Sequence, residues 1–182
     1  LAEGEMLQLQ KASSSDTTEE DYLRIIYSKT ASLFVAACES AAISVEAPET
    51  YVKAARDYAY YLGLAFQIKD DIFDYSDSSQ IGKPVGIDLR EQKITLPLLG
   101  ALKKADSDKD TDIRRMVREI VDNPDNEHMI REFVYEQDGV GYAEAKLQEY
   151  VLKAVEVLSV LPDSEDRRLL EFLARFVALR TL

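Results

Sequence analysis

The sequence predicts an all-α protein that forms one helical domain over residues 1–182. This length is enough for one sizeable hydrophobic core and demands no second one. Only seven glycines and five prolines occur, and most of them stand between segments in which apolar residues recur three and four positions apart. That spacing is typical of helices, and no alternating apolar and polar segment predicts a strand.

In the first half of the chain, the predicted helices span 1–10, 18–45 and 48–75. A polar loop is expected over residues 11–17. Thr18 fits the position that caps a helix, and three acidic residues follow it where the positive end of the helix dipole lies. Pro48 fits the first helical turn, where its missing N–H costs no hydrogen bond. The third helix is the longest, and the short connection predicts that it lies antiparallel to the second.

In the second half, serine, glycine and proline residues predict a loop over 77–87. A helix is expected from about Asp88, with a kink or a functional turn at Pro97, because an interior proline removes a backbone hydrogen bond. Charged residues predict another loop over 103–110. The remaining helices are expected at 111–121, 125–137, 142–160 and 164–179.

The composition excludes several classes of function. A formal net charge of −12 argues against nucleic acid or an anionic membrane as partner. Cys38 is the only cysteine and His128 the only histidine, which excludes a disulfide framework, a cysteine-rich zinc site and a multi-histidine metal site. There is no run of 18 uncharged apolar residues, and residues 1–5 do not resemble a signal peptide, so we expect a cytoplasmic location.

Three aspartates gather near the end of the long predicted helix. Asp70 and Asp74 lie one turn apart, and Asp71 flanks them. Like charges at this spacing repel, and the negative end of the helix dipole adds to the cost, so a cation is expected to compensate. Mg²⁺ prefers oxygen ligands and usually binds one or two carboxylates together with substrate phosphates. The alternative is a solvated acidic face, whereas the spacing does not fit a calcium-binding loop.

Three lysines are expected to supply positive charge near these aspartates. Lys29 lies beside Thr30 on the helix that should neighbour the long one, Lys83 follows in a Gly–Lys–Pro segment, and Lys93 comes soon after. Each lysine alone would pass as a surface charge. Together they predict a ring of positive charge around a metal–diphosphate site, which is how anionic groups in transfer reactions are held.

Taken in order, these segments resemble the C-terminal half of the trans-isoprenyl diphosphate synthases, the head-to-tail polyprenyl synthases. The likeness is strong over about residues 1–105, and the later residues match only as helices of suitable size. The matching segments are Gly4–Glu5, YSKTASLF at 27–34, GLAFQIKDDIFD at 63–74 and GKPVGIDLREQKITLP at 82–97. The resemblance implies the C-terminal portion of the isoprenoid synthase helical bundle, in which two aspartate-rich motifs face each other across a deep cavity.

The resemblance also implies a reaction and residue roles. The aspartates at 70, 71 and 74 look like the second motif, which would hold Mg²⁺ on an allylic diphosphate. After that diphosphate departs, Gln67 and Thr30 would face the carbocation, and the allylic carbon would join isopentenyl diphosphate with loss of a proton. The implied residues are Asp70, Asp71 and Asp74 for the metal, Lys29, Lys83 and Lys93 for the diphosphate, and Lys29, Thr30 and Gln67 for catalysis.

The sequence also departs from the family pattern. The first aspartate-rich motif, and the cationic residues that bind isopentenyl diphosphate, belong upstream of Gly4–Glu5. We therefore expect half of a site, no turnover by this chain alone, and either a homodimer or association with the missing half. A non-catalytic partner subunit of a heteromeric synthase is the alternative. A class I terpene cyclase is weaker, because its motif on the later helix usually contains Asn, Ser and Glu.

Overall fold

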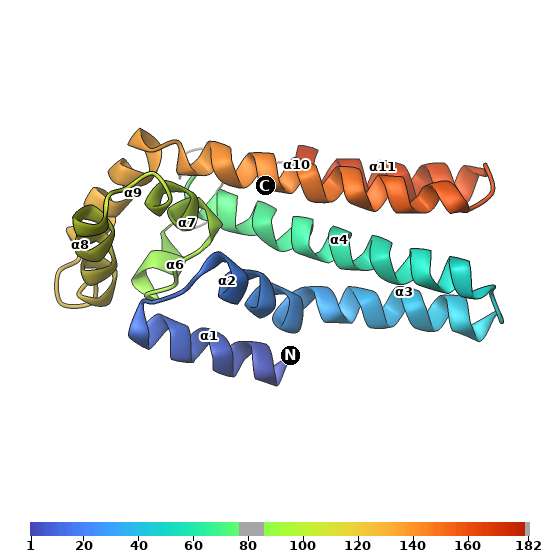
Figure 1. Ribbon diagram of the computed structural model, residues 1–182, viewed down its shortest axis with the longest axis horizontal. Coiled ribbons are helices and arrows are strands. Elements are labelled where there is room, and N and C mark those ends of the chain that lie inside the picture. The colour runs from blue at the N-terminus through green and yellow to red at the C-terminus, as the bar shows by residue number, and fades with distance from the viewer. Residues whose placement is uncertain (77–85, 181–182) are drawn as a thin grey trace.

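The computed structural model describes residues 1–76 and 86–180, and every regular element within them is helical, which confirms the all-α class (Figure 1). None of these helices is long and apolar enough to cross a membrane. The elements are α1 (Ala2–Ser14), α2 (Glu19–Ile26), a π-helical turn η1 (Tyr27–Ala31), α3 (Ser32–Ser44), α4 (Glu49–Asp74), α6 (Ile87–Arg90), α7 (Leu96–Leu102), α8 (Ser107–Arg118), α9 (Asn126–Glu136), α10 (Gly139–Val157), a 3₁₀ turn η2 (Leu158–Val160) and α11 (Glu165–Leu179).

The long helix α4 is the centre of the fold. It packs between α3 and α10, and α11 also contacts it (Figure 1). Helix α3 runs antiparallel to α4, as the sequence predicts. The short helices α6, α7, α8 and α9 gather at the end of the bundle where α4 ends (Figure 1). The acidic end of α4 is therefore surrounded by short helices and their connections.

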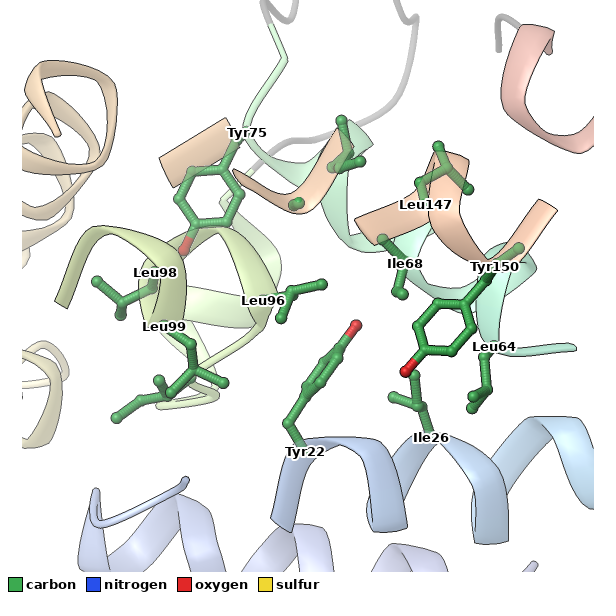
Figure 2. Close-up of a cluster of buried hydrophobic side chains, with 14 of the residues drawn as sticks. Tyr22, Ile26, Leu64, Ile68, Tyr75, Leu96, Leu98, Leu99, Leu147 and Tyr150 are labelled. Carbon is green, nitrogen blue, oxygen red and sulfur yellow. The ribbon is translucent and has the colours of Figure 1, made fainter. Parts of the chain in front are cut away.

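The hydrophobic core lies between α2, α4, α7 and α10, whose side chains meet in Figure 2. Ile68 of α4, Leu98 of α7 and Leu147 of α10 are almost fully buried. The apolar residues of α4 recur at three and four positions, so one of its faces enters this core. Helix α3 has no fully buried residue, and Leu33 on it is 60% exposed. The core therefore lies on the opposite side of α4 from much of α3.

Two boundaries in the first half differ from prediction. The loop expected over 11–17 is wrong in its first part, because α1 continues to Ser14 and Lys11 forms an ion pair with Asp21 at 2.9 Å. The predicted start at Thr18 is confirmed by a reciprocal capping box with Asp21. The helix expected over 18–45 is interrupted by η1, whose wider turn lies against α4. Tertiary contact decides this interruption, since the local sequence is helical throughout.

The continuous helix expected from Asp88, kinked at Pro97, is also wrong. Helix α6 ends after one turn, Gln92 follows in a left-handed conformation with φ of 60°, and an extended Thr95 begins α7. Pro97 then lies in the first turn of α7, where no intrahelical hydrogen bond is lost.

Two later helices begin earlier than predicted. Asp106 caps α8 by accepting the N–H of Lys109 at 2.8 Å, so the charged loop is shorter than 103–110. Gly139 forms the first turn of α10, although the sequence suggests a break there. A β-carbon at this position would lie 2.2 Å from the carbonyl oxygen of Pro97, so glycine permits the close approach of α10 to α7.

Candidate functional site

Gln67 is the centre of a hydrogen-bond chain that joins η1, α4 and α2. Thr30 Oγ1 donates to Gln67 Oε1 at 3.0 Å, and Gln67 Nε2 donates to Asp71 Oδ1 at 2.9 Å. The hydroxyl of Tyr22 donates to Asp71 Oδ2 at 2.6 Å. Because the Gln67 amide is bonded at both its oxygen and its nitrogen, its orientation is fixed. The sequence-predicted pair Thr30 and Gln67 is thus in direct contact.

Asp71, the carboxylate of this hydrogen-bond chain, is buried and has a raised pKa. Its residue is only 4% exposed. Burial, followed by the charge of Asp88, raises the pKa of Asp71 to about 7, although hydrogen bonds from Tyr22 and Gln67 oppose the shift. The charge of Asp70 adds to the rise. A carboxylate held this way gains from any cation that approaches it, since a nearby positive charge favours the ionised form.

Asp71 and Gln67 share one small pocket of about 50 Å³ with Asp88, Lys29 and Lys93. Lys93 Nζ lies 3.1 Å from Asp88 Oδ1, and it also pairs with Glu91. Burial opposes the charge of Lys93, but these two acidic partners outweigh it and raise its pKa. The pocket therefore brings together carboxylates and lysines that lie far apart in the sequence.

Lys29 enters the same pocket from η1. Its Nζ lies 2.9 Å from Gln8 Oε1 and 3.2 Å from Glu5 Oε1, both on α1. Gln8 and Lys11 of α1 also line the pocket. Helix α1 thus covers the pocket on the side of Lys29 and supplies the partners of this lysine.

Asp70 lies elsewhere. Its Oδ1 pairs with Arg180 Nη2 at 2.5 Å. The same Arg180 nitrogen donates to the carbonyl oxygen of Phe66 at 2.9 Å, and the guanidinium lies 4.2 Å from the centre of the Phe66 ring. Asp70 is not among the residues that line the pocket of Asp71. The repulsion expected within the acidic cluster is therefore relieved here by an arginine.

Asp74 joins the end of α4 to the start of α6. Its two carboxylate oxygens accept the N–H groups of Ile87 at 3.0 Å and Asp88 at 3.2 Å. Burial, followed by the charge of Asp88, raises the pKa of Asp74, and the two backbone N–H groups oppose this. The three predicted metal ligands thus have three separate sets of partners.

Because each aspartate has its own partners, the described residues do not form a complete metal site by themselves. Within residues 1–76 and 86–180, no group of three or more His, Cys, Asp or Glu side chains is close enough to hold a metal ion. The donor chemistry of the pocket still fits Mg²⁺ with a diphosphate, because that ion needs only one or two carboxylates when phosphates complete its shell. Lys83, predicted to bind the diphosphate, lies outside the described residues.

Two residues of the site were not predicted from sequence. Asp88 was interpreted only as a helix start, although it stands between two predicted site lysines, and this position is the signal that could have found it. Tyr22 is not among the site residues that the sequence predicts. Its bond to Asp71 joins residues 49 positions apart, and no local pattern indicates such a contact.

Comparison with known proteins gives concordant matches. The model of the polyprenyl synthetase family matches residues 1–136. The octaprenyl diphosphate synthase of Haemophilus influenzae is 40% identical over 178 residues, covering 96% of this chain and 53% of that protein. Heptaprenyl diphosphate synthase component 2 of Geobacillus stearothermophilus is 33% identical, covering 99% of this chain and 55% of that protein.

A solved structure agrees with these relatives. The polyprenyl synthase from Caulobacter crescentus, complexed with calcium and isoprenyl diphosphate, superposes with a TM-score of 0.87 at 35% identity. The match covers 98% of this chain and 55% of that chain. The chain described here therefore spans about half the length of the proteins it matches.

Proposed function

Because the chain belongs to the polyprenyl synthetase family, we propose that it supplies one half of a Mg²⁺-dependent trans-prenyltransferase site. The proposed reaction condenses an allylic diphosphate with isopentenyl diphosphate. One observation carries the proposal, namely the pocket that Asp71 and Asp88 share with Lys29, Lys93 and Gln67. Asp74 adjoins this pocket through the N–H of Asp88, whereas Asp70 lies outside it. The set combines carboxylate oxygens, lysine ammonium groups and a neutral dipole in one place.

Lysines hold the departing diphosphate in this proposal. Lys29 and Lys93 exchange Glu5 and Glu91 for the oxygens of a diphosphate, which carries more negative charge than a single carboxylate. Lys83 joins them on the sequence pattern alone. The positive charge is then already in place when the allylic C–O bond breaks, so the developing negative charge needs no rearrangement of solvent.

The aspartates would hold the metal. Asp70 and Asp74 are the proposed ligands, with Asp71 assisting. A carboxylate has about four acceptor positions, so Asp74 can keep its two backbone N–H partners and still ligate a cation. Asp70 has to share or release Arg180. Bound there, Mg²⁺ stabilises negative charge on the leaving diphosphate.

Thr30 and Gln67 are the proposed neighbours of the allylic carbocation. Their oxygens are neutral dipoles, which stabilise a cation without forming a covalent adduct. Asp71 and Tyr22 fix the direction of the Gln67 amide through the hydrogen bonds described above. As the allylic C–O bond breaks and diphosphate departs, the new C–C bond forms to isopentenyl diphosphate, and the resulting carbocation loses a proton to give the product.

Binding of inorganic diphosphate with Mg²⁺ tests the proposed site without turnover. At 100 times its dissociation constant, the ligand should stabilise the chain by about 2.7 kcal/mol, which raises the unfolding temperature by roughly 5–10 °C for a chain of this size. Asp70→Ala combined with Asp74→Ala should abolish the rise, and so should EDTA. Thermal unfolding followed by circular dichroism measures it.

A matched control for this test removes two other aspartates. Asp112 and Asp163 are exposed and form ion pairs on the surface, so Asp112→Ala combined with Asp163→Ala takes away the same charge without touching the site. The control variant should keep the full rise in unfolding temperature on binding Mg²⁺ and diphosphate. A rise that survives the Asp70 and Asp74 changes would show that the metal ligands are assigned wrongly.

We also propose that this chain converts substrate only in the presence of the remaining part of the synthase. That part corresponds to the half of the relatives that this chain does not match. The chain should give no product from isopentenyl and allylic diphosphates alone, and product when the unmatched segment of the Haemophilus influenzae relative is added. The amount of labelled product formed from labelled isopentenyl diphosphate measures this activity. Turnover by the chain alone would contradict the proposal.

A second candidate follows from one relative, which is named a component of its synthase. In that case the chain is a non-catalytic subunit that modifies a partner within a heteromeric synthase. Adding it to an intact polyprenyl synthase would then change the length of the product, and the Asp70 and Asp74 changes would leave that effect intact. A catalytic half requires both aspartates, so the double variant separates the two functions.

A further inference from the structure

Helix α9 holds the C-terminal end of α4, although no α9 residue lines the pocket. Arg131 Nη1 donates to the carbonyl oxygen of Asp74 at 2.8 Å, and Nη2 donates to those of Tyr75 at 3.0 Å and Ser76 at 3.3 Å. The hydroxyl of Tyr135, one turn later on α9, also donates to the carbonyl oxygen of Tyr75. The last carbonyls of a helix lack partners within the helix, and α9 supplies them here.

Arg131 also compensates the negative charge at this end of α4. The aspartates lie in the last two turns, where the helix dipole is negative. A guanidinium bound to the final carbonyls places positive charge at the dipole end, which favours carboxylates that would otherwise be repelled. Together with Arg180 at Asp70, Arg131 thus supplies compensating positive charge at the acidic cluster, from a position 57 residues after Asp74.

The same helix holds the segment that begins at residue 86. Glu127 of α9 accepts two hydrogen bonds from Arg90, Nε to Oε2 at 2.7 Å and Nη2 to Oε1 at 3.1 Å. Gly86 has a φ of 76°, and its N–H donates to the carbonyl oxygen of Asp74 at 3.1 Å. A β-carbon on Gly86 would lie 2.1 Å from Glu127 Oε1. Helix α9 therefore contacts both the end of α4 and the start of α6.

A continuous path leads from this contact to the pocket. Arg131 binds the main chain at Asp74, whose carboxylate binds the N–H groups of Ile87 and Asp88. The carboxylate of Asp88 accepts a hydrogen bond from Lys93 within the pocket. The end of α4 is thereby joined through hydrogen bonds to a proposed metal ligand, to Asp88 and to a proposed diphosphate-binding lysine.

We propose that Arg131 is a positioning residue for the metal–diphosphate site, acting through the last carbonyls of α4 on Asp74 and, through Asp74, on Asp88. It touches neither the diphosphate nor the metal. The proposal rests on the proposed function, because it concerns the affinity of that same site. It differs from a purely structural role in one measurable respect, which is the affinity for Mg²⁺-diphosphate at constant fold.

Arg131→Gln should raise the concentration of diphosphate needed for half-maximal stabilisation in the presence of Mg²⁺. Partners that orient metal ligands typically change metal affinity by 10–100-fold when removed, and we expect about tenfold here. Arg131→Lys should fall between the wild type and Arg131→Gln, because a lysine keeps the charge but lacks the planar fork that reaches three carbonyls. Tyr135→Phe removes one of the two donors to Tyr75 and should give a smaller rise. Titrations followed by thermal unfolding measure all three.

Two variants serve as controls. Tyr58→Phe removes a hydroxyl that donates to the carbonyl oxygen of Leu170 at 2.9 Å, far from the acidic end of α4. It should lower the unfolding temperature without moving the half-maximal concentration. Arg168→Gln removes an arginine that pairs with Asp163 on the surface, and it should change neither quantity.

The outcomes are separable. An Arg131→Gln variant that unfolds at lower temperature but keeps the wild-type half-maximal concentration would overturn the proposal and leave Arg131 as a structural residue. If Arg131→Gln does not fold, unchanged half-maximal concentrations in both Arg131→Lys and Tyr135→Phe would overturn it. Absence of any response in the wild type is a different result, which contradicts the proposed function itself.

Discussion

Replacing Gly63 with alanine is expected to lower the free energy of unfolding by about 1–3 kcal/mol, the usual cost of overpacking a core. Alanine is the better helix former by about 1 kcal/mol, so local propensity predicts the opposite sign. The close contact decides the sign of the change in stability, because a β-carbon at this position would lie 2.6 Å from both Cα and Cβ of Ala31. Ala31 is fully buried and part of η1, so the backbones of α4 and η1 have to separate.

The same substitution should weaken the candidate site. Gly63 lies one turn before Gln67 on α4, and Ala31 follows Thr30 on η1. Separation of the two elements therefore lengthens the 3.0 Å hydrogen bond between Thr30 and Gln67. Urea unfolding followed by helical circular dichroism measures the stability, since the chain has no tryptophan to report it.

Gly141→Ala is the matched control for this prediction. A β-carbon there would meet the carboxylate of Asp138, whose side chain is 76% exposed and free to turn away. The control should change the free energy of unfolding by no more than about 0.5 kcal/mol, apart from a gain in helix propensity. Equal stability of Gly63→Ala and wild type would mean that α4 and η1 do not approach as closely as described.

Asp71→Asn is expected to remove a large part of the pH dependence of stability. The pKa of Asp71 is raised to about 7 in the folded chain, against about 3.9 in an unfolded one. Between these values the folded state binds a proton that the unfolded state lacks, so stability falls as the pH rises from about 4 to about 7. A difference of about 3 in pKa corresponds to about 4 kcal/mol, and the asparagine variant should lack this loss.

The measurement compares free energies of unfolding in urea at pH 4, 5.5, 7 and 8, with EDTA present to remove metal ions. The groups that face Asp71 are Tyr22 on α2, Gln67 and Asp70 on α4, and Asp88 on α6. Asp112→Asn, at an exposed ion pair on α8, should keep the wild-type slope. If the free energy of unfolding changed with pH equally in Asp71→Asn and in the wild type, the pKa of Asp71 would not be raised by folding.

Much of the fold follows from the sequence, and the two errors at Pro97 and Gly139 share one cause. The long helix, its antiparallel neighbour and the cap at Thr18 all depend on residues close together in the chain. The errors at Pro97 and at Gly139 occur where two helices meet, since α10 approaches the carbonyl oxygen of Pro97. Their local preferences were interpreted as a kink and a break, whereas Pro97 lies in the first turn of α7 and Gly139 permits the close approach of α10 to it.

The candidate site divides in the same way. The sequence predicts that Lys29, Thr30, Gln67 and Lys93 lie near the acidic cluster, and in the described structure these residues lie in or beside one pocket with Asp71. It did not indicate Asp88 or Tyr22, nor that Arg131 would bind the end of α4. Roles in metal and diphosphate binding stay predictions for all of them.

By itself, the sequence determined the helical class, the position of three aspartates at the end of the longest helix, and the family. Periodicity and short motifs carry that information, because they depend on neighbouring residues. Only the tertiary structure decided what each aspartate binds. Asp71 meets Tyr22 across 49 positions, Asp70 meets Arg180 across 110, and Asp74 meets the N–H of Ile87 across 13. Successive helical residues point about 100° apart, so adjacent aspartates meet different neighbours, and the packing of distant segments decides which ones.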